Sequence, residues 1–326
     1  MKQKFPQSER YHGVVLLWWF AAVFLFQTTF FVPRLIAAEK TVVIFRSQQI
    51  AAYNEAILGF EEGCKEKNIS IKTIYDLHGD TEEGKRIIQM VKKDGTKPDA
   101  ILAVGVLAAT LAKEHFSDIP VIFCMVINHD RFNLQGANIT GISSEASIED
   151  QFAVLKEILG PHKNIGVIYD PLKTRKIVAQ ANIVAKQFGF NLVKSEVVLE
   201  KEVASALKNI TPKIDALWLI PDSTVITKNT LSSIPKIIQD RRVPVFSTSD
   251  VMVKAGALVS VSPDYKHTGI QAAQLVQRLL TDPPSISLGI QQPKKLKLTL
   301  NTQTAKTIGI NLLFIQSYPD VVLYPQ

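Results

Sequence analysis

Short apolar runs alternate along the chain with longer stretches in which apolar residues recur at helical spacing. In the first part of the chain this pattern predicts strands at 41–45, 69–75, 100–104 and 121–125 and helices at 56–67, 82–93 and 108–115. Strands that are apolar throughout and alternate with helices are typical of a parallel sheet covered on both faces. We therefore expect an α/β fold.

A second series of the same kind follows the first. The loop 136–141 leads into a strand at 140–143, and Ser147, with Asp150 three residues later, marks the start of a helix. The pattern then predicts strands at 164–169, 191–198 and 216–220 and helices at 174–188, 202–210 and 232–240. Two consecutive series of similar length predict two lobes of one architecture.

The stretch 243–280 departs from this regular alternation. It predicts a short strand, a short helix, a second strand, a turn at Ser262-Pro263-Asp264 and then a long amphipathic helix. Because this turn separates a tight βαβ unit from the long helix, we predict that the chain crosses there from one lobe to the other. The tail, with a strand at 296–300 and a helix at 302–308, can then return to each lobe in turn.

The first 38 residues have the pattern of an export signal. Lys2, Lys4 and Arg10 precede the apolar run 14–26, and Ala37-Ala38 offers small residues for cleavage. An uncleaved membrane anchor is the alternative, because the apolar stretch continues to residue 32. Either interpretation places the chain from Glu39 onward in the periplasm or another extracytoplasmic space.

The net charge and the two cysteines bear on the kind of partner and on the state of the thiols. Four basic residues and one acidic residue lie in the first 38, so the formal charge falls from +7 to +4 without them, and the excess is spread. Such a charge does not favour nucleic acid as a partner. Cys64 falls in a helical pattern and Cys124 in an apolar strand, so we expect two buried thiols, with a disulfide as the alternative.

Candidate binding residues follow the ends of the predicted strands. In an open parallel α/β sheet, ligands bind beyond the carboxyl ends of the strands. The residues there are polar, mixed in charge and poor in glycine, which suits a small zwitterion. The candidates are Ser47, Gln48, Gly105, Asn128, Tyr169, Asp170, Asp222, Ser223, Thr224 and Asp250.

Several of these candidates also have a structural interpretation. Asp222, Asp250 and Ser47 precede helix-like patterns and can serve as helix caps, and Tyr169 can be the last core residue of its strand. His129-Asp130 resembles a general-base pair, but adjacent residues at a strand end usually point apart. No nucleophile elbow, zinc-protease or phosphate-loop motif occurs, and no two His stand at metal-ligand spacing. We expect no catalytic residue, no cofactor and no metal site.

Three stretches carry a resemblance to a known family. They are DALWLIPDSTV at 215–225, VPVFSTSDVMVKAGALVSVSPDYKHTGIQAAQLV at 243–276 and KKLKLTLNTQTAKTIGI at 294–310. Weaker matches are AILAVG, IPVIF and NITGIS in the first part of the chain. With these stretches, the chain from about 41 to 313 resembles the ABC-transporter substrate-binding proteins that include tryptophan- and tyrosine-binding periplasmic proteins.

The resemblance implies the type I periplasmic-binding-protein fold, with two Rossmann-like lobes joined by three crossings. The crossings would fall near Ser143, near 261–264 and near 291–295. One lobe would then comprise 39–143 and 264–292, and the other 144–263 and 293–326.

The resemblance also implies a function without chemistry. A monomer would capture a small ligand, commonly an aromatic amino acid, and deliver it to an ABC transporter permease, with Asp222 at the position of the family's acidic ligand-binding residue. Many members have a Val-Thr-Asp-Pro-like turn where this chain has 127–131 without a proline. An unrelated metabolite therefore stays open as the ligand, as do a membrane-anchored sensory module and an enzyme on the same fold.

Overall fold

The computed structural model describes residues 39–95, 97–231, 234, 235, 240–281, 287–313, 315, 318 and 320–325. The predicted export signal at 1–38 and most of the predicted helix 232–240 lie outside the described residues. The chain from Lys40 to Gln326 forms one compact unit. None of the helices that are described combines the length and the apolarity needed to cross a membrane.

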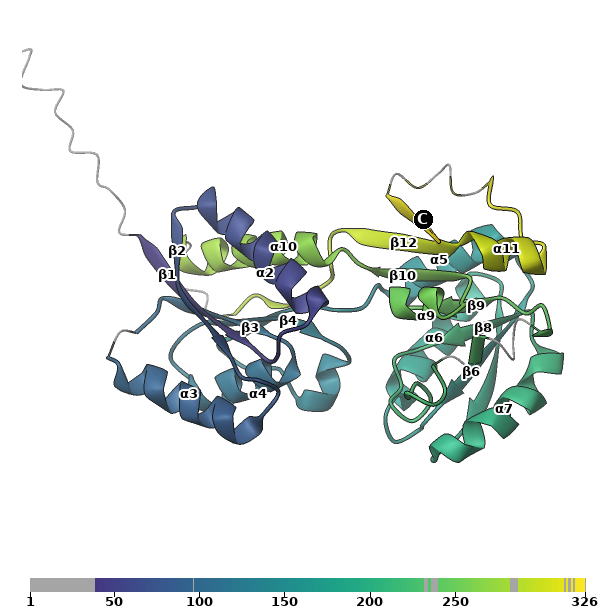
Figure 1. Cartoon of the computed structure of the whole chain (residues 1–326), viewed down its shortest axis with the longest axis horizontal. Coiled ribbons are helices and arrows are strands. Elements are labelled where there is room, and N and C mark those ends of the chain that lie inside the picture. The colour runs from purple at the N-terminus through teal and green to yellow at the C-terminus, as the bar shows by residue number, and fades with distance from the viewer. Residues whose placement is uncertain are drawn as a thin grey trace, which may run out of the picture. The chain divides into compact units, whose positions relative to one another are not determined.

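The first sheet has six strands, and all its pairings are parallel (Figure 1). Three neighbouring strands, Ala100–Val104, Val121–Val126 and Ile139–Ser143, are buried throughout, which agrees with their largely apolar sequences. In spatial order the strands are β11 (Gly289–Gln291), β5 (Ile139–Ser143), β4 (Val121–Val126), β3 (Ala100–Val104), β1 (Lys40–Arg46) and β2 (Ile69–Asp76). The sequence did not predict β11.

Helices cover both faces of this sheet, and each face has its own core. The helices α2 (Ala51–Lys65) and α10 (Tyr265–Thr281) pack on one face, with Phe60 and Ala272 fully buried. The helices α3 (Thr81–Lys93) and α4 (Val106–His115) pack on the other, with Ile88 and Ala112 fully buried. Figure 1 shows α10, distant in sequence, beside α2.

The second sheet has seven strands and one antiparallel pairing (Figure 1). In spatial order the strands are β13 (Val321–Tyr324), β12 (Leu296–Asn301), β10 (Val259–Pro263), β9 (Val245–Ser247), β8 (Ala216–Leu219), β6 (Asn164–Tyr169) and β7 (Asn191–Glu196). The sheet is mostly parallel, as predicted, and among the described strands only the pairing of β10 with β12 is antiparallel. The chain leaves this sheet along β10 and re-enters it along β12, so the two strands run in opposite directions.

The second sheet is also covered on both faces. Its two cores contain buried residues of α5 (Ile148–Leu159) and α6 (Arg175–Gln187) on one side and of α7 (Val203–Ile210) and α9 (Asp250–Lys254) on the other. The helix α11 (Thr302–Ile308) joins the first of these cores through Ala305.

The chain passes three times between the two sheets, as predicted for the fold. It passes after β5, after β10 and after β11. The exact lobe boundaries at 143, 263 and 292 stay predictions.

The predicted turn at Ser262-Pro263-Asp264 is wrong for its first two residues. Ser262 and Pro263 pair with Lys297 and Leu296 in the antiparallel ladder, and the missing N–H of Pro263 is tolerated at the strand end. Asp264 follows the strand, and its carboxylate accepts the backbone N–H of His267 at 2.8 Å, which stabilises the start of α10.

The two cysteines are free and buried, as expected. Cys64 lies in α2 and Cys124 in β4. Burial raises the pKa of each thiol to about 12, so both stay protonated at neutral pH.

The packing of α2 on α10 generates a stability prediction. A methyl group at Gly269 would lie 1.9 Å from the carbonyl oxygen of Ala56, so the two helix backbones would have to separate. We expect Gly269→Ala to lower the free energy of unfolding by about 3 kcal/mol or more in urea titrations. The control is Gly84→Ala in α3, where the added methyl lies 2.6 Å from Cδ1 at the flexible end of Leu111 and in ordinary contact with Leu77, so it should change stability by about 1 kcal/mol at most. Equal effects of the two substitutions would contradict this packing.

Candidate functional site

A cavity of about 520 Å³ is lined by residues that follow strands of both sheets. Several lining residues are apolar, and Ser247, Thr248 and Ser249 add hydroxyl groups at the end of β9. Burial and the negative charges of Asp250 and Glu55 raise the pKa of Tyr265 to about 12, so its phenol stays protonated. The lining residues are Ile127, Asn128, Arg131, Phe132, Ser144, Glu145, Pro221, Asp222, Ser223, Ile226, Leu231, Ser247, Thr248, Ser249, Val251, Met252 and Tyr265.

A smaller cavity of about 310 Å³ adjoins the first. The two share Asn128, Glu145, Pro221 and Thr248 in their linings. The side chain of Glu145 therefore borders both cavities.

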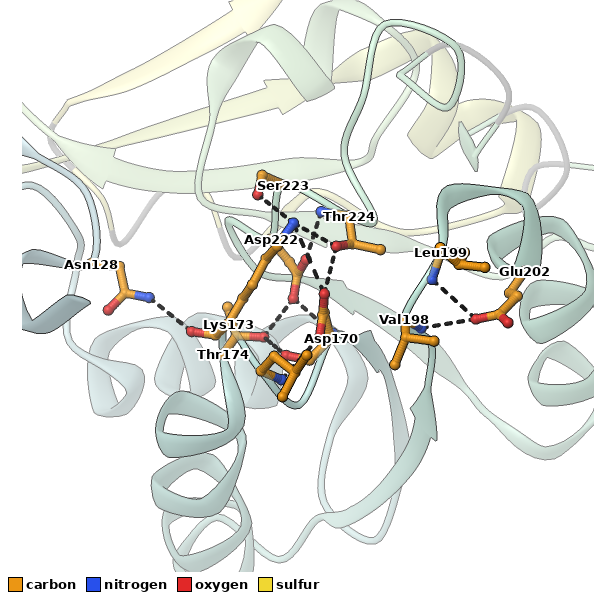
Figure 2. A network of polar contacts seen from close by, with 11 residues as sticks. Asn128, Asp170, Lys173, Thr174, Val198, Leu199, Glu202, Asp222, Ser223 and Thr224 are labelled. Atoms are coloured by element: carbon orange, nitrogen blue, oxygen red, sulfur yellow. Dashed lines mark hydrogen bonds and ion pairs between the residues drawn. The ribbon is translucent and has the colours of Figure 1, made fainter. Parts of the chain in front are cut away.

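Asp222 is buried beside the larger cavity and is held by donors from the connections that follow β6 and β8. Its Oδ2 accepts the backbone N–H of Asp170 at 2.8 Å and the hydroxyl of Thr174 at 2.6 Å, and its Oδ1 accepts the N–H of Thr224 at 2.9 Å. Figure 2 shows this carboxylate at the centre of the network. These bonds tie the end of β8 to the end of β6. Asp222 is 2% exposed and starts a turn, so it does not cap a helix.

Asp170, Ser223 and Thr224 belong to the same network (Figure 2). Asp170 accepts the hydroxyl of Thr224 at 2.7 Å and the N–H of Leu172 at 2.9 Å. Burial raises the pKa of Asp170, but these hydrogen bonds and the charges of Lys173 and Arg131 outweigh it and lower the pKa overall. Lys173 donates to the hydroxyls of Ser223 and Thr224 at 2.9 and 2.6 Å.

Asn128 connects the loop after β4 to both the first crossing and the second sheet. Its backbone is left-handed, with φ 49°, which asparagine tolerates better than most residues. Its N–H donates to Glu145 Oε2 at 3.3 Å, and its side-chain amide donates to the carbonyl of Lys173 at 3.3 Å. Figure 2 shows the second of these bonds.

Three predicted residues cluster after β1 and β3 but line neither cavity. The hydroxyl of Ser47 accepts the N–H of Ala108 at 3.0 Å and so satisfies the start of α4. Gly105 has a φ of 89°, and a Cβ there would lie 2.7 Å from both Ser47 Oγ and the Tyr53 ring. Gln48 is exposed next to them. Their roles in binding stay predictions.

The last two predicted residues lie elsewhere. The hydroxyl of Tyr169 donates to Glu196 at 2.6 Å, and its ring belongs to the core of the second sheet. Asp250 is the first residue of α9 and faces Lys254 at 3.4 Å, whereas the preceding Ser249 supplies the cap by accepting the N–H of Val251. The interpretation of Asp250 as a cap is therefore wrong by one residue.

His129 and Asp130 do not point apart as expected. They lie in a short 3-10 turn rather than at the end of a strand, and His129 Nε2 is 3.6 Å from Asp130 Oδ1. Within the described part of the chain, no group of three or more His, Cys, Asp or Glu side chains could hold a metal ion.

Sequence reasoning missed Ser144, Glu145, Arg131 and Tyr265. Glu145 Oε1 and Ser144 Oγ are buried and have no hydrogen-bond partner among the described residues. Burial and the nearby charge of Asp130, partly offset by the N–H of Asn128, raise the pKa of Glu145 to about 6. The guanidinium of Arg131 lies 5.9 Å from the ring centre of Phe132, and none of the described carboxylates forms an ion pair with it. The larger cavity is thus lined by a carboxylate with one unpartnered oxygen and by a guanidinium that forms no ion pair within the described part of the chain.

Most of the chain matches a known protein family. A family model described as ABC transporter substrate binding protein matches residues 42–314. A curated protein named tyrosine-binding protein, from Clostridioides difficile strain R20291, is 24% identical over 225 residues, covering 67% of this chain and 65% of that protein. The alignment therefore spans slightly less than two thirds of that relative.

Two solved structures share the fold. The ligand-free, open structure of a substrate binding protein with adhesive properties from Clostridium difficile has a TM-score of 0.74 at 20% identity, covering 87% of this chain and 98% of that one. An ABC domain in complex with L-Trp from Streptococcus pneumonia has a TM-score of 0.64 at 19% identity, covering 87% of this chain and 100% of that one. Both confirm a two-lobe α/β fold.

The unpartnered carboxylate of Glu145 generates a prediction on stability and pH. Because its pKa rises from 4.5 to about 6 on folding, the folded state holds more proton than the unfolded state between these values. The free energy of unfolding therefore falls as pH rises through this window. We expect Glu145→Gln to be more stable than wild type by about 1–2 kcal/mol at pH 7.5, and the difference to shrink toward pH 4.

Urea titrations at the two pH values measure this difference. Glu66→Gln is the control, because Glu66 is exposed at the end of α2 and should show no such pH dependence. A Glu145→Gln variant that is less stable than wild type at pH 7.5 would show that the ionised carboxylate stabilises the folded protein, which contradicts the prediction.

Proposed function

The chain belongs to the ABC transporter substrate-binding protein family, and we propose that it captures an amino acid, preferably an aromatic one, for an ABC importer. The observation that carries this proposal is the cavity of about 520 Å³. Its volume lies within the range of small-molecule sites, and it combines apolar surface with a few convergent polar groups.

The lining of the cavity matches the parts of such a ligand. Phe132, Met252 and Tyr265 offer apolar and aromatic surface to a side chain. Arg131 can pair with a carboxylate through two parallel N–H donors. The hydroxyls of Ser247, Thr248 and Ser249 can supply further hydrogen bonds. A zwitterion with one large apolar group would use all of these features.

The relatives support an aromatic ligand. One is named a tyrosine-binding protein, and another was solved with L-Trp. Both relatives are at most 24% identical to this chain. The proposal of an aromatic ligand therefore depends on the lining of the cavity as much as on these relatives.

The mechanism that we propose is capture without covalent chemistry. Residues that follow strands of both sheets line the cavity, so a bound ligand would contact both lobes. It would favour whichever arrangement lets both lobes touch it, and the population would shift toward that state. A permease on the membrane would read the ligand-bound form. The protein would act as a monomer outside the cytoplasm.

A thermal-shift panel tests this function. The purified protein is heated with each L-amino acid, with D-tyrosine and with L-arabinose. We expect L-tyrosine or L-tryptophan at about 100 times its Kd to stabilise the protein by about 2.7 kcal/mol, which raises Tm by several degrees. D-Tyrosine and the uncharged sugar should have little effect. A shift with the sugar and with no amino acid would contradict the proposal.

A further inference from the structure

Two carboxylates that line the larger cavity, Asp222 and Glu145, and two that lie next to its lining residues, Asp170 and Asp250, differ in how many partners they have. Asp222 accepts three hydrogen bonds, and Asp170 accepts two and lies near Lys173. Asp250 faces Lys254 at 3.4 Å. Glu145 alone among these four has a buried oxygen, Oε1, without a partner in the described chain.

Such an oxygen is costly to bury. An ionised carboxylate removed from water without a full set of donors destabilises the protein, and its pKa rises in response. The raised pKa of Glu145 agrees with this geometry. Asp130 adds a second negative charge nearby, so the site attracts a cation.

The shape of the acceptor site indicates which cation fits. Glu145 Oε2 already accepts the N–H of Asn128, so Oε1 is the oxygen that still lacks a donor. A planar guanidinium pairs best with both oxygens of a carboxylate. A compact ammonium can donate to one oxygen and has two further N–H donors for other acceptors. The unpartnered hydroxyl of Ser144, next in the chain, can accept one of these.

We propose that Glu145, assisted by Ser144, receives the ammonium group of the bound amino acid, in place of Asp222. This inference rests on the proposed function and adds the residue that recognises the amine. Asp222 then serves to hold the ends of β6 and β8 together.

Glu145 lies in a segment that joins the two sheets, so a ligand that it binds would contact this segment. β5 ends at Ser143 and α5 begins at Ile148, so Glu145 lies in the four-residue connection of the first crossing. A ligand held there would bind at one of the three segments that join the two sheets. Asn128, which donates to Glu145 and to Lys173, links the same segment to the second sheet.

Calorimetric titrations of matched variants test the assignment. The purified protein is titrated with L-tyrosine and with 3-(4-hydroxyphenyl)propionate, which keeps the ring and carboxylate but lacks the amine. We expect Glu145→Gln to weaken L-tyrosine binding about 30-fold or more, and Ser144→Ala to weaken it about tenfold. Glu145→Gln should not weaken binding of the propionate, because that ligand lacks the group that Glu145 contacts.

The control variant and the opposing outcomes distinguish the role of Glu145 from the proposed capture of an amino acid. Glu66→Gln, an exposed substitution of the same kind, should bind as wild type does. Full L-tyrosine binding by Glu145→Gln, with loss in Asp222→Asn, would overturn the role of Glu145 and leave amino-acid capture intact. Equal binding of L-tyrosine and the propionate by wild type would also overturn it. A wild-type protein that binds no L-amino acid overturns the proposed function itself.

Discussion

The antiparallel pairing of β10 with β12 is the interaction on which the architecture depends. It holds together the strand by which the chain leaves the second sheet and the strand by which it returns. The pairing is extended by Asp264, whose N–H donates to the carbonyl of Lys295 at 3.0 Å. The buried side chain of Gln271 in α10 then bonds to Gln292 and Lys294 in the third crossing. Two of the three crossings are therefore fixed to each other, and Tyr265 enters the cavity from the helix that they position.

The polar residues near the cavity divide into those that are satisfied by the protein and those that are not. Asp222 and Asp170 accept hydrogen bonds from the connections that follow β6 and β8, which makes them part of the scaffold. Glu145 and Ser144 each keep a buried polar atom without a partner. A binding site that is preorganised for a charged ligand has to leave such atoms unpaired in the free protein, at some loss of stability. The unpaired atoms are therefore better guides to the ligand than the buried Asp222.

Much of the fold could be predicted from the sequence, because the apolar periodicity of a buried strand or amphipathic helix is local. The strand Ala100–Val104 and the helix Thr302–Ile308 have the predicted bounds. The direction of β12 could not be predicted in this way, because apolar alternation is the same for parallel and antiparallel neighbours. Pro263 was assigned to a turn because its strand partner, Leu296, lies far along the chain.

The candidate site was harder to predict, because the contacts that define it join segments far apart in the sequence. Residues after strand ends were identified by rule, and Asn128, Asp222 and Ser223 do line the cavity. Whether an acidic residue is satisfied depends on neighbours from other segments, such as Thr174 for Asp222 and Asn128 for Glu145. Glu145 lies in a short connection with no periodic pattern, so nothing in its local sequence distinguished it.

On this proposal, the carboxylate of Glu145 lacks a full set of hydrogen-bond donors until an amine binds. Carboxyl-carbon NMR of the protein labelled at glutamate, with Glu145→Gln to assign the signal, measures this directly. We expect the pKa of Glu145 to be about 6 in the free protein and to fall below 4.5 when the protein is saturated with L-tyrosine. A pKa that stays the same on saturation would contradict it.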